Sequence, residues 1–540
     1  MSGSITLENR FGVNKMELIS LKYAIFVIVL LVLYYCFPKK YRWYVLLAGS
    51  MAYYVIICKW YVLFIIFTIC TTYGSTIWID KLLKEQNAIV KSHKEDWDRQ
   101  TRKEYKEKGR KKRVAVMLFA LLCNFGILAF LKYIPYAGEL GLLLPLGISF
   151  YTFQSMGYVM DVYREIVEPE KNFLKVALFV SFFPQIIQGP IAIYDKLAGQ
   201  LYEGHSLKLE NLQKGALLVL WGVMKKLVIA DRAVNIINFV MDKPTDFSGT
   251  YVFFAAVVYA LQLYADFSGG IDIVRGIAEM FGITMSINFN HPYFSRSLTE
   301  YWHRWHMTLG DWCRNYIFYP LSISKRFLNF GKWLKPRFGA HISKVLPGCI
   351  ASVITFIVIG VWHGANMKYL YFGLWNGIVI MLAELFAPVN KKVAGGFFKL
   401  TGLREKGIFA TIVSVLWTFM LILVGYYFDI AANASTAFHM LFKSVTDFHI
   451  GELGINNIIL NLGACGLDEY DILLLIICTL LWFFISFVEE NKKLDMRDFI
   501  LSRKLPLRWA IIYLGIFIVI IFGYYGPVSY THLTLPTIRL

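Results

Sequence analysis

Charged side chains are scarce in this chain of 540 residues: 17% are Asp, Glu, Lys or Arg, whereas 57% are hydrophobic. A soluble globular protein carries roughly 25% charged residues, so much of the surface that would keep a soluble protein in water is missing. The charges gather in short runs separated by apolar stretches of about 20 residues, the length that a helix needs to cross hydrocarbon. The composition excludes a disordered chain and a secreted disulfide scaffold, and it predicts an all-α, polytopic integral membrane protein.

Metal-binding cysteine patterns are also missing. The eight cysteines are scattered, mostly within apolar runs, without CxxC or CxxH spacing, so we interpret them as small hydrophobic residues. No cleavable signal peptide is evident, because the first apolar run lacks a small-residue cleavage site and leads directly to Lys39 and Lys40. We expect no bound cofactor and no metal.

Acidic residues are outnumbered by basic ones, 37 against 55, which gives a net charge of +18. In a membrane protein this excess indicates the positive-inside bias of cytoplasmic loops, not nucleic-acid binding. Residues 80–113 contain 13 basic and 7 acidic residues, and residues 322–344 contain six basic residues and no acid. Both segments are therefore predicted to be cytoplasmic, and the N-terminus is predicted to lie outside.

The pattern of apolar runs predicts about 11–13 transmembrane or re-entrant helices. We divide the chain into an N-terminal extension (1–18), a membrane domain (19–526) with a cytoplasmic basic loop at 80–113, and a non-native tail (527–540). The tail ends in YTHLTLPTIRL, which resembles a translated sequencing adapter, so we expect the native C-terminus to be truncated near Pro527. The spans are expected at 19–37, 43–58, 60–79, 114–133, 141–163, 173–193, 214–230, 250–275, 346–362, 368–388, 408–430, 471–488 and 509–526.

Two segments do not have the pattern of simple spans. Residues 183–190 combine two prolines with the amides of Gln185 and Gln188. Proline breaks a helix, and broken backbone is tolerated at membrane depth only where it lines protein or a water-filled cavity. Residues 288–320 are too polar to span directly but rich in aromatic residues, which is typical of an interfacial or re-entrant helix.

Histidines supply the first candidates for chemistry, because ionisable groups inside a membrane are costly. His363 ends an apolar run and is followed by Gly364 and Ala365. Histidine can accept a proton from a hydroxyl near neutral pH and return it to a leaving group. The alternative is a structural imidazole that satisfies a backbone carbonyl between helices.

A second histidine pair lies in the aromatic segment. His303 and His306 are three residues apart and are expected to share a helix face, and Ser297 with Glu300 has the spacing of a capping box. An interfacial amphipathic helix is the alternative interpretation. A metal site is not predicted, because no third ligand stands at helical spacing.

A polar group follows the apolar run 251–261: Asp266 and Ser268 precede Gly269 and Gly270. Such residues indicate close helix packing around a hydrogen-bonded cluster. A catalytic and a scaffold role are both open, and we favour the scaffold role.

Several long motifs occur in a fixed order. They are PLGISFYTFQSMGYVMDVYR at 145–164, FPQIIQGPI at 183–191, LYADFSGGIDIVRGIAEMFGI at 263–283, NFNHPYFSRSLTEYWHRWHMTLGDWCRNYIFYPL at 288–321 and WHGA at 362–365. Together they resemble the membrane-bound O-acyltransferase (MBOAT) family, in particular its bacterial alginate O-acetyltransferase-like branch. That branch is related to the D-alanyl transfer protein of teichoic acid modification.

The resemblance implies a ring of tilted helices around a central tunnel, with a catalytic region at 288–363. It implies a catalytic role for His363 and a second functional role for His306. No role is carried to His303, where relatives more often have arginine or asparagine. The residues expected to line the tunnel or contact substrate are Trp305, Trp362, Asn366, Asp266, Ser268, Gln185 and Gln188.

The function implied by the resemblance is transfer of an acyl group, acetyl in the simplest case, to an extracellular cell-surface polysaccharide. A cytoplasmic thioester such as acetyl-CoA would be the donor, and an SGNH-type partner would act on the outer face. His363 would act as general base, with His306, Asn366 or indole N–H groups stabilising the oxyanion. Lys225, Lys226 and the basic segment 322–344 are candidates for meeting the CoA phosphates, although we favour a positive-inside role for them.

Three alternatives remain open. D-alanyl transfer from a carrier protein to teichoic acid would share every motif. A lipid acyltransferase of the same family would act on phospholipids or sterols. A transporter would also contain broken helices with buried polar groups.

Overall fold

A computed structural model describes residues 18–134, 144–401, 407–454 and 465–525, together with the isolated positions 138, 142 and 404. The regular structure of these residues is helical throughout. The expected N-terminal extension, apart from residue 18, and the expected tail (527–540) lie outside the described residues. The helical structure and its membrane-length apolar helices confirm the prediction of an all-α polytopic membrane protein.

Within the described residues, seven helices are long and apolar enough to cross a membrane, or eight if the bent pair α17–α18 forms one span. One of the seven, Lys39–Ser92, joins two of the expected spans, and the shorter apolar helices Leu21–Cys36 and Phe173–Gln188 are additional. The count by length and composition is lower than the expected 11–13 because that figure also included short and re-entrant pieces.

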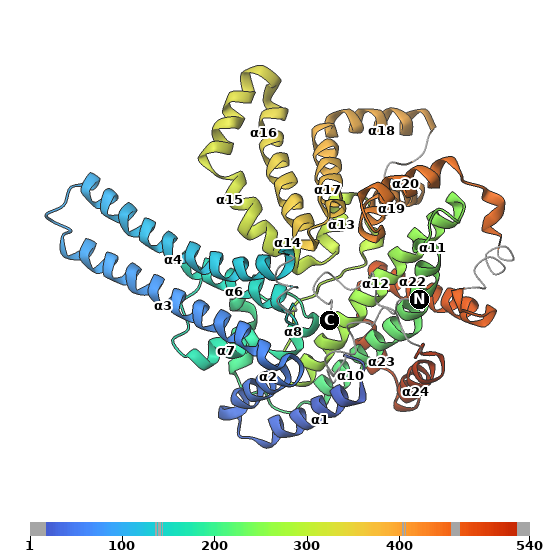
Figure 1. The fold of residues 1–540 in the computed structure, drawn as a ribbon, viewed down its shortest axis with the longest axis horizontal. Helices are drawn as coiled ribbons and strands as arrows, with labels where there is room; N and C mark the ends of the chain where they lie inside the picture. The colour runs from blue at the N-terminus through green and yellow to red at the C-terminus, as the bar shows by residue number, and fades with distance from the viewer. Residues whose placement is uncertain are drawn as a thin grey trace. The chain divides into compact units, whose positions relative to one another are not determined.

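The described residues divide into two compact units: those up to residue 219 with 274–286 form the first, and those of 220–273 with 287–525 form the second. In the first unit, α3 and α4 run side by side as a long helical hairpin (Figure 1). α6 packs on both helices of this hairpin, and α7 packs on α2 and α3. The helices that begin in this unit are α1 (Leu21–Cys36), α2 (Arg42–Cys58), α3 (Val62–Ser92), α4 (Arg99–Tyr133), α6 (Ile148–Tyr163), α7 (Phe173–Ser181), α8 (Phe183–Gln188), α9 (Tyr194–Tyr202) and α10 (Leu209–Val223).

In the second unit, α16 and α17 form the most extensive helix pair, and α17 also packs on α19 (Figure 1). A π-helix, η4 (Met224–Ala230), continues α10 and is followed by α11 (Asp231–Met241). The remaining helices are α12 (Gly249–Met280, whose last residues belong to the first unit), α13 (Leu298–Arg304), α14 (Met307–Cys313), the π-helix η6 (Arg314–Phe318), α15 (Tyr319–Ser322), α16 (Lys325–His363), α17 (Met367–Leu385), α18 (Ala387–Thr401), α19 (Ile408–Ile430), α20 (Ala434–Thr446), α22 (Glu469–Lys492), α23 (Met496–Leu501) and α24 (Leu505–Phe522).

The segment expected as a cytoplasmic loop, 80–113, contains regular structure. α3 continues to Ser92 and α4 begins at Arg99, so most of this segment is helical. The Asp98 side chain accepts a hydrogen bond from the backbone N–H of Thr101 and caps α4. The two helices approach closely at Gly109, where an added Cβ would lie 2.4 Å from Oε1 of Gln86. Contacts between the two helices explain why a charged segment remains helical beyond the apolar run.

Two other segments bend as their residues require. The expected break in 173–193 is confirmed: α7 ends at Ser181, and α8 starts at Phe183 with Pro184 in its first turn, where a missing N–H costs nothing. α16 is interrupted at Gly339, whose φ of 80° favours glycine. Its two arms pack closely against each other. A Cβ added to Gly331 on one arm would lie 2.9 Å from the carbonyl oxygen of Ser343 on the other.

Candidate active site

The loop between α13 and α14 carries His306. Ser297 caps α13 by accepting the backbone N–H of Glu300 at 3.1 Å, whereas the Glu300 carboxylate accepts the N–H of Arg296 at 2.8 Å. Only one half of the expected capping box therefore forms. α13 ends at Arg304, and α14 begins after His306.

The expectation that His303 and His306 share one helix face is wrong. The backbone of His306 is in the left-handed region, with φ 43° and ψ 51°, so the helix is broken between the two residues. His303 is exposed and His306 is buried. No cluster of three or more metal-ligating side chains occurs among the residues that the structure describes.

One ring nitrogen of His306 has a hydrogen-bond partner within the described part of the chain and the other does not. Its Nδ1 lies 3.1 Å from Oδ1 of Asn288. Its Nε2 is buried and has no hydrogen-bond partner among the described residues. The ring of Phe267 packs edge-on against it, with 4.9 Å between the ring centroids. Burial lowers the pKa of His306 to about 3, and the nearby imidazole of His363 adds to this shift.

His363 is the last residue of α16 and is half-buried. Its ring stacks on Tyr369, with centroids 6.0 Å apart, and meets the edge of Phe372 at 5.5 Å. Gly364 is required for this stack, because a Cβ there would lie 2.5 Å from the Tyr369 ring. A residue with a side chain at this position of the WHGA motif would therefore clash with the Tyr369 ring.

Trp362 connects the two histidines. Its ring centroid lies 4.9 Å from that of His363 and 6.5 Å from that of His306. The structure therefore brings the two histidines singled out in the sequence into one neighbourhood, although they are 57 positions apart.

The other residues of the expected site fall into different places. Trp305 is buried, and its ring stacks on Tyr301. Asn366 is exposed and caps α17 by accepting the N–H of Lys368 at 3.1 Å, while its Nδ2 donates to the carbonyl oxygen of Ala432 at 3.4 Å. Its amide is therefore already engaged by the backbone.

Gln185 and Gln188 lie on α8 of the first unit. Gln185 is buried, and its side-chain amide donates to the carbonyl oxygen of Pro190 at 2.9 Å. This bond supports the turn after α8. Gln188 is the last residue of that helix and is partly exposed.

Asp266 and Ser268 belong to an ionic cluster around the π-helix η4. Lys225 donates to Ser268 Oγ at 2.9 Å and to Asp272 Oδ2 at 2.6 Å, and Lys226 pairs with Asp266. The Lys225 side chain is only 4% exposed. These contacts fit the scaffold role that the sequence favours for Asp266 and Ser268.

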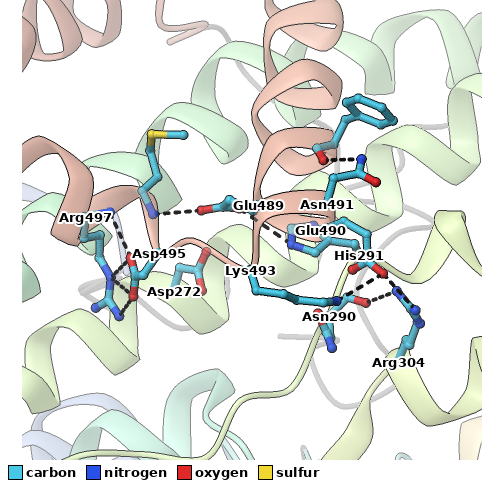
Figure 2. Close-up of polar contacts among 12 residues, drawn as sticks. Asp272, Asn290, His291, Arg304, Glu489, Glu490, Asn491, Lys493, Asp495 and Arg497 are labelled. Carbon is cyan, nitrogen blue, oxygen red and sulfur yellow. Dashed lines mark hydrogen bonds and ion pairs between the residues drawn. The ribbon is translucent and has the colours of Figure 1, made fainter.

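A further ionic contact holds the loop that carries His306. Figure 2 shows Arg304, two residues before His306, beside Glu490 near the end of α22. The guanidinium lies 3.0 Å from the Glu490 carboxylate and 2.7 Å from that of Glu300. Nε2 of His291, which precedes α13 in the chain, lies 3.7 Å from the Glu489 carboxylate. A helix distant in sequence thus contacts both the end of α13 and the segment before it.

Asn288 and Thr308 are the residues of the site that sequence analysis missed. Oδ1 of Asn288 accepts hydrogen bonds from the Thr308 backbone N–H at 3.1 Å and from the Thr308 hydroxyl at 2.9 Å, in addition to facing His306. Asn288 is fully buried. Its position as the first residue of the quoted motif at 288–321 was the available signal, but no spacing rule connects it to a residue 18 positions later.

Comparison with known proteins gives consistent matches. Residues 169–335 match the family described as MBOAT, membrane-bound O-acyltransferase family. The chain is 30% identical over 314 residues to a peptidoglycan O-acetyltransferase of Helicobacter pylori, covering 51% of this chain and 56% of that protein. It is 30% identical over 315 residues to a protein of Pseudomonas syringae pv. tomato named probable alginate O-acetylase, covering 58% and 54%.

A third relative is named for a different activity. The chain is 26% identical over 288 residues to a teichoic acid D-alanyltransferase of Bacillus subtilis, covering 52% of this chain and 67% of that protein. The matches to the first two relatives span little more than half of the length of each. The matched segment 169–335 contains His306, and His363 lies beyond it.

Proposed function

We propose that the chain is an acyltransferase of the cell membrane, because residues 169–335 match the membrane-bound O-acyltransferase family. In this proposal it moves an acetyl group from a cytoplasmic thioester, acetyl-CoA, to a hydroxyl of a cell-surface polysaccharide. The observation that carries the proposal is the meeting of His306 and His363 around Trp362. Ionisable side chains within a membrane protein are energetically costly, so two neighbouring imidazoles are candidates for a functional site.

His363 is the residue we assign as general base. It stands at the C-terminal end of α16, where the helix dipole stabilises a positive charge, and it is half-buried, so a substrate can reach it. The hydroxyl oxygen attacks the thioester carbonyl carbon while His363 takes the hydroxyl proton. The C–S bond then breaks, and the thiolate leaves with the proton returned by His363.

The negative charge that develops on the carbonyl oxygen requires an N–H donor. Trp362 lies between the two imidazoles, so its indole N–H is our candidate, with a contribution of roughly 3–4 kcal/mol to the barrier. The aromatic rings of Phe267, Trp362 and Phe372 around the two histidines exclude water, which would otherwise hydrolyse the thioester.

The orientation of the reaction rests on charge. The basic segments 80–113 and 322–344 are assigned to the cytoplasm, with the N-terminus outside. The donor would then enter from the cytoplasmic side, and an SGNH-type partner would complete transfer to the polysaccharide on the outer side. The relatives named as an O-acetyltransferase and an O-acetylase support acetyl as the group that is moved.

D-alanyl transfer is the second candidate, because a teichoic acid D-alanyltransferase is also among the relatives. In that reaction the donor would be a carrier-protein thioester, and the acceptor would be teichoic acid. The two candidates use the same histidines and differ in the mass of the group that reaches the polymer.

Mass spectrometry of the surface polymer tests the proposal in cells. We expect acetyl groups in cells that express the wild-type chain and their loss with His363→Ala. The matched control is His303→Ala, which removes an exposed histidine and should leave acetylation unchanged. D-alanyl groups in place of acetyl would select the second candidate, and full acetylation by His363→Ala would overturn both.

A further inference from the structure

We propose that Asn288 is a positioning residue that fixes His306 in one tautomer, with the proton on Nδ1, so that Nε2 accepts a hydrogen bond from a donor group of the substrate. The inference deepens the proposed acyl-transfer site, and it rests on that function only for the identity of the substrate. The tautomer itself follows from contacts within the second unit.

The orientation of the Asn288 amide is determined by its hydrogen-bond partners. A side-chain amide has an oxygen and a nitrogen that look alike in shape, so its orientation must come from its partners. The backbone N–H of Thr308 lies 3.1 Å from one atom of the amide. A backbone N–H can only donate, so that atom is the oxygen, Oδ1. The alternative orientation would set two donors against each other.

The orientation of the Asn288 amide determines which ring nitrogen of His306 carries the proton. Nδ1 of His306 lies 3.1 Å from the same Oδ1, and an amide oxygen only accepts. Nδ1 must therefore carry the hydrogen. A neutral imidazole has a single ring proton, which leaves Nε2 with a lone pair. Because burial keeps the pKa of His306 at about 3, the ring is neutral at physiological pH and this tautomer persists.

The backbone of His306 also depends on its neighbours. His306 has φ 43° and ψ 51°, a conformation that few residues other than glycine adopt and that persists only where contacts hold it. The carbonyl oxygen of Asn288 accepts the N–H of Met307 at 2.9 Å. One residue therefore holds both the ring of His306 and the peptide that follows it.

Nε2 of His306 is buried and lacks a hydrogen-bond partner among the described residues. Leaving a buried polar atom unpaired is unfavourable, and such atoms are rare in native proteins. A substrate hydroxyl or amide N–H would satisfy it. His306 then orients the substrate while His363 takes the proton, and His306 does not act as the oxyanion donor that the sequence suggested.

Nitrogen NMR on the full chain in lipid nanodiscs tests the tautomer without reference to activity. The protein is labelled with ¹⁵N-histidine, and the His306 signals are identified by their loss in His306→Asn, because asparagine tolerates the left-handed backbone. We expect a protonated Nδ1 and a bare Nε2 at pH 7. A protonated Nε2 would overturn the inference. A bare Nε2 in a protein without acyl transfer would leave the inference intact and refute the proposed function.

Kinetics then test the positioning role. Asn288→Leu removes the acceptor at similar volume, and we expect kcat/KM for acyl transfer to fall roughly 10–100-fold, as for other residues that orient a functional imidazole. Asn288→Asp keeps an acceptor oxygen facing Nδ1 and should restore the wild-type tautomer in the NMR spectrum. The control is Asn290→Ala, because the exposed Asn290 contacts Arg304 only through its backbone.

A folded Asn288→Leu protein with the wild-type rate and the wild-type tautomer would contradict the inference. If that variant fails to fold, the NMR spectrum of the wild-type protein and the Asn288→Asp variant still decide the question.

Discussion

The guanidinium of Arg304 lies 3.0 Å from the carboxylate of Glu490, although the two residues are 186 positions apart. Both side chains are about four-fifths buried, at 18% and 21% exposure. The pair attaches the loop that carries His306 to the end of α22 (Figure 2). The position of one histidine of the proposed site therefore depends on a helix far outside the segment that matches the family.

Breaking this pair should loosen the loop. For Arg304→Met and Glu490→Gln, a double-mutant cycle measured by thermal unfolding in detergent should show a coupling of about 1 kcal/mol, between the values for exposed and for buried pairs. The control is Lys493→Ala: Lys493 is 76% exposed and lies 3.6 Å from Glu490, so its coupling should be near zero. Strict additivity of Arg304→Met and Glu490→Gln would show that the pair does not act as a clamp.

Gly364→Ala should displace the ring that stacks on His363. The new Cβ would lie 2.5 Å from Tyr369, a distance that aromatic carbons do not tolerate, while the extended backbone at Gly364 (φ 172°) adds no strain. We expect at least a tenfold loss of acyl transfer, because misplacement by about 1 Å costs roughly 10²-fold. Gly348→Ala, on the same helix with nothing within 4 Å, should behave like the wild type. Equal activity of both variants would contradict the steric role of Gly364.

Stability should depend on pH through His306. Its folded-state pKa of about 3 is below the ordinary value of 6.5, so the unfolded chain binds a proton that the folded chain does not. The stabilisation is fully present above pH 6.5 and is lost as pH falls from 6.5 toward 3. Between pH 6.5 and 5 the loss is about 2 kcal/mol, at about 1.4 kcal/mol per unit.

The variant His306→Asn isolates this contribution. Denaturant unfolding of both proteins at pH 7.5 and pH 5 should show a smaller acid destabilisation in the variant. The acid destabilisation of the two proteins should differ by about 2 kcal/mol. An identical pH dependence would mean that His306 is solvated or charged in the folded protein.

The Lys225–Asp272 pair should behave as scaffold. Lys225→Met leaves the carboxylate of Asp272 without its closest cation, so we expect a destabilisation of about 3–5 kcal/mol. In contrast, the double variant Lys225→Met/Asp272→Leu removes both charges and should recover most of that loss. The KM for acetyl-CoA should be unchanged in the double variant, because Lys225 is buried. A selective rise of that KM would return Lys225 to the donor site.

Periodicity and length predicted the apolar helices well. α19 begins at Ile408 and ends at Ile430, the bounds expected from its apolar run, because the length of an uninterrupted apolar run sets the length of a helix that crosses hydrocarbon. The helical hairpin of α3 and α4 was missed because contacts between the helices, such as the bond from Gln86 Nε2 to the Lys106 carbonyl oxygen, outweigh the charge of the segment.

The candidate site was predicted in part. His306 and His363 are chemically distinctive in an apolar chain, and the structure brings them together. The left-handed backbone of His306 and the role of Asn288 were not predictable, since both depend on hydrogen bonds between residues 18 to 20 positions apart. No local pattern encodes such a contact, and the expected shared helix face of His303 and His306 failed for this reason.

The most direct measurement of the central claim is acyl transfer by the purified full-length chain in proteoliposomes. Labelled acetyl-CoA is supplied on one side, an acceptor oligosaccharide together with the SGNH-type partner on the other, and the rates of the wild type, His363→Ala and His303→Ala are compared. The account predicts transfer by the wild type and by His303→Ala, with a fall of at least roughly 10²-fold for His363→Ala, the low end of the effect of a general base. Transfer by folded His363→Ala at the wild-type rate would contradict it.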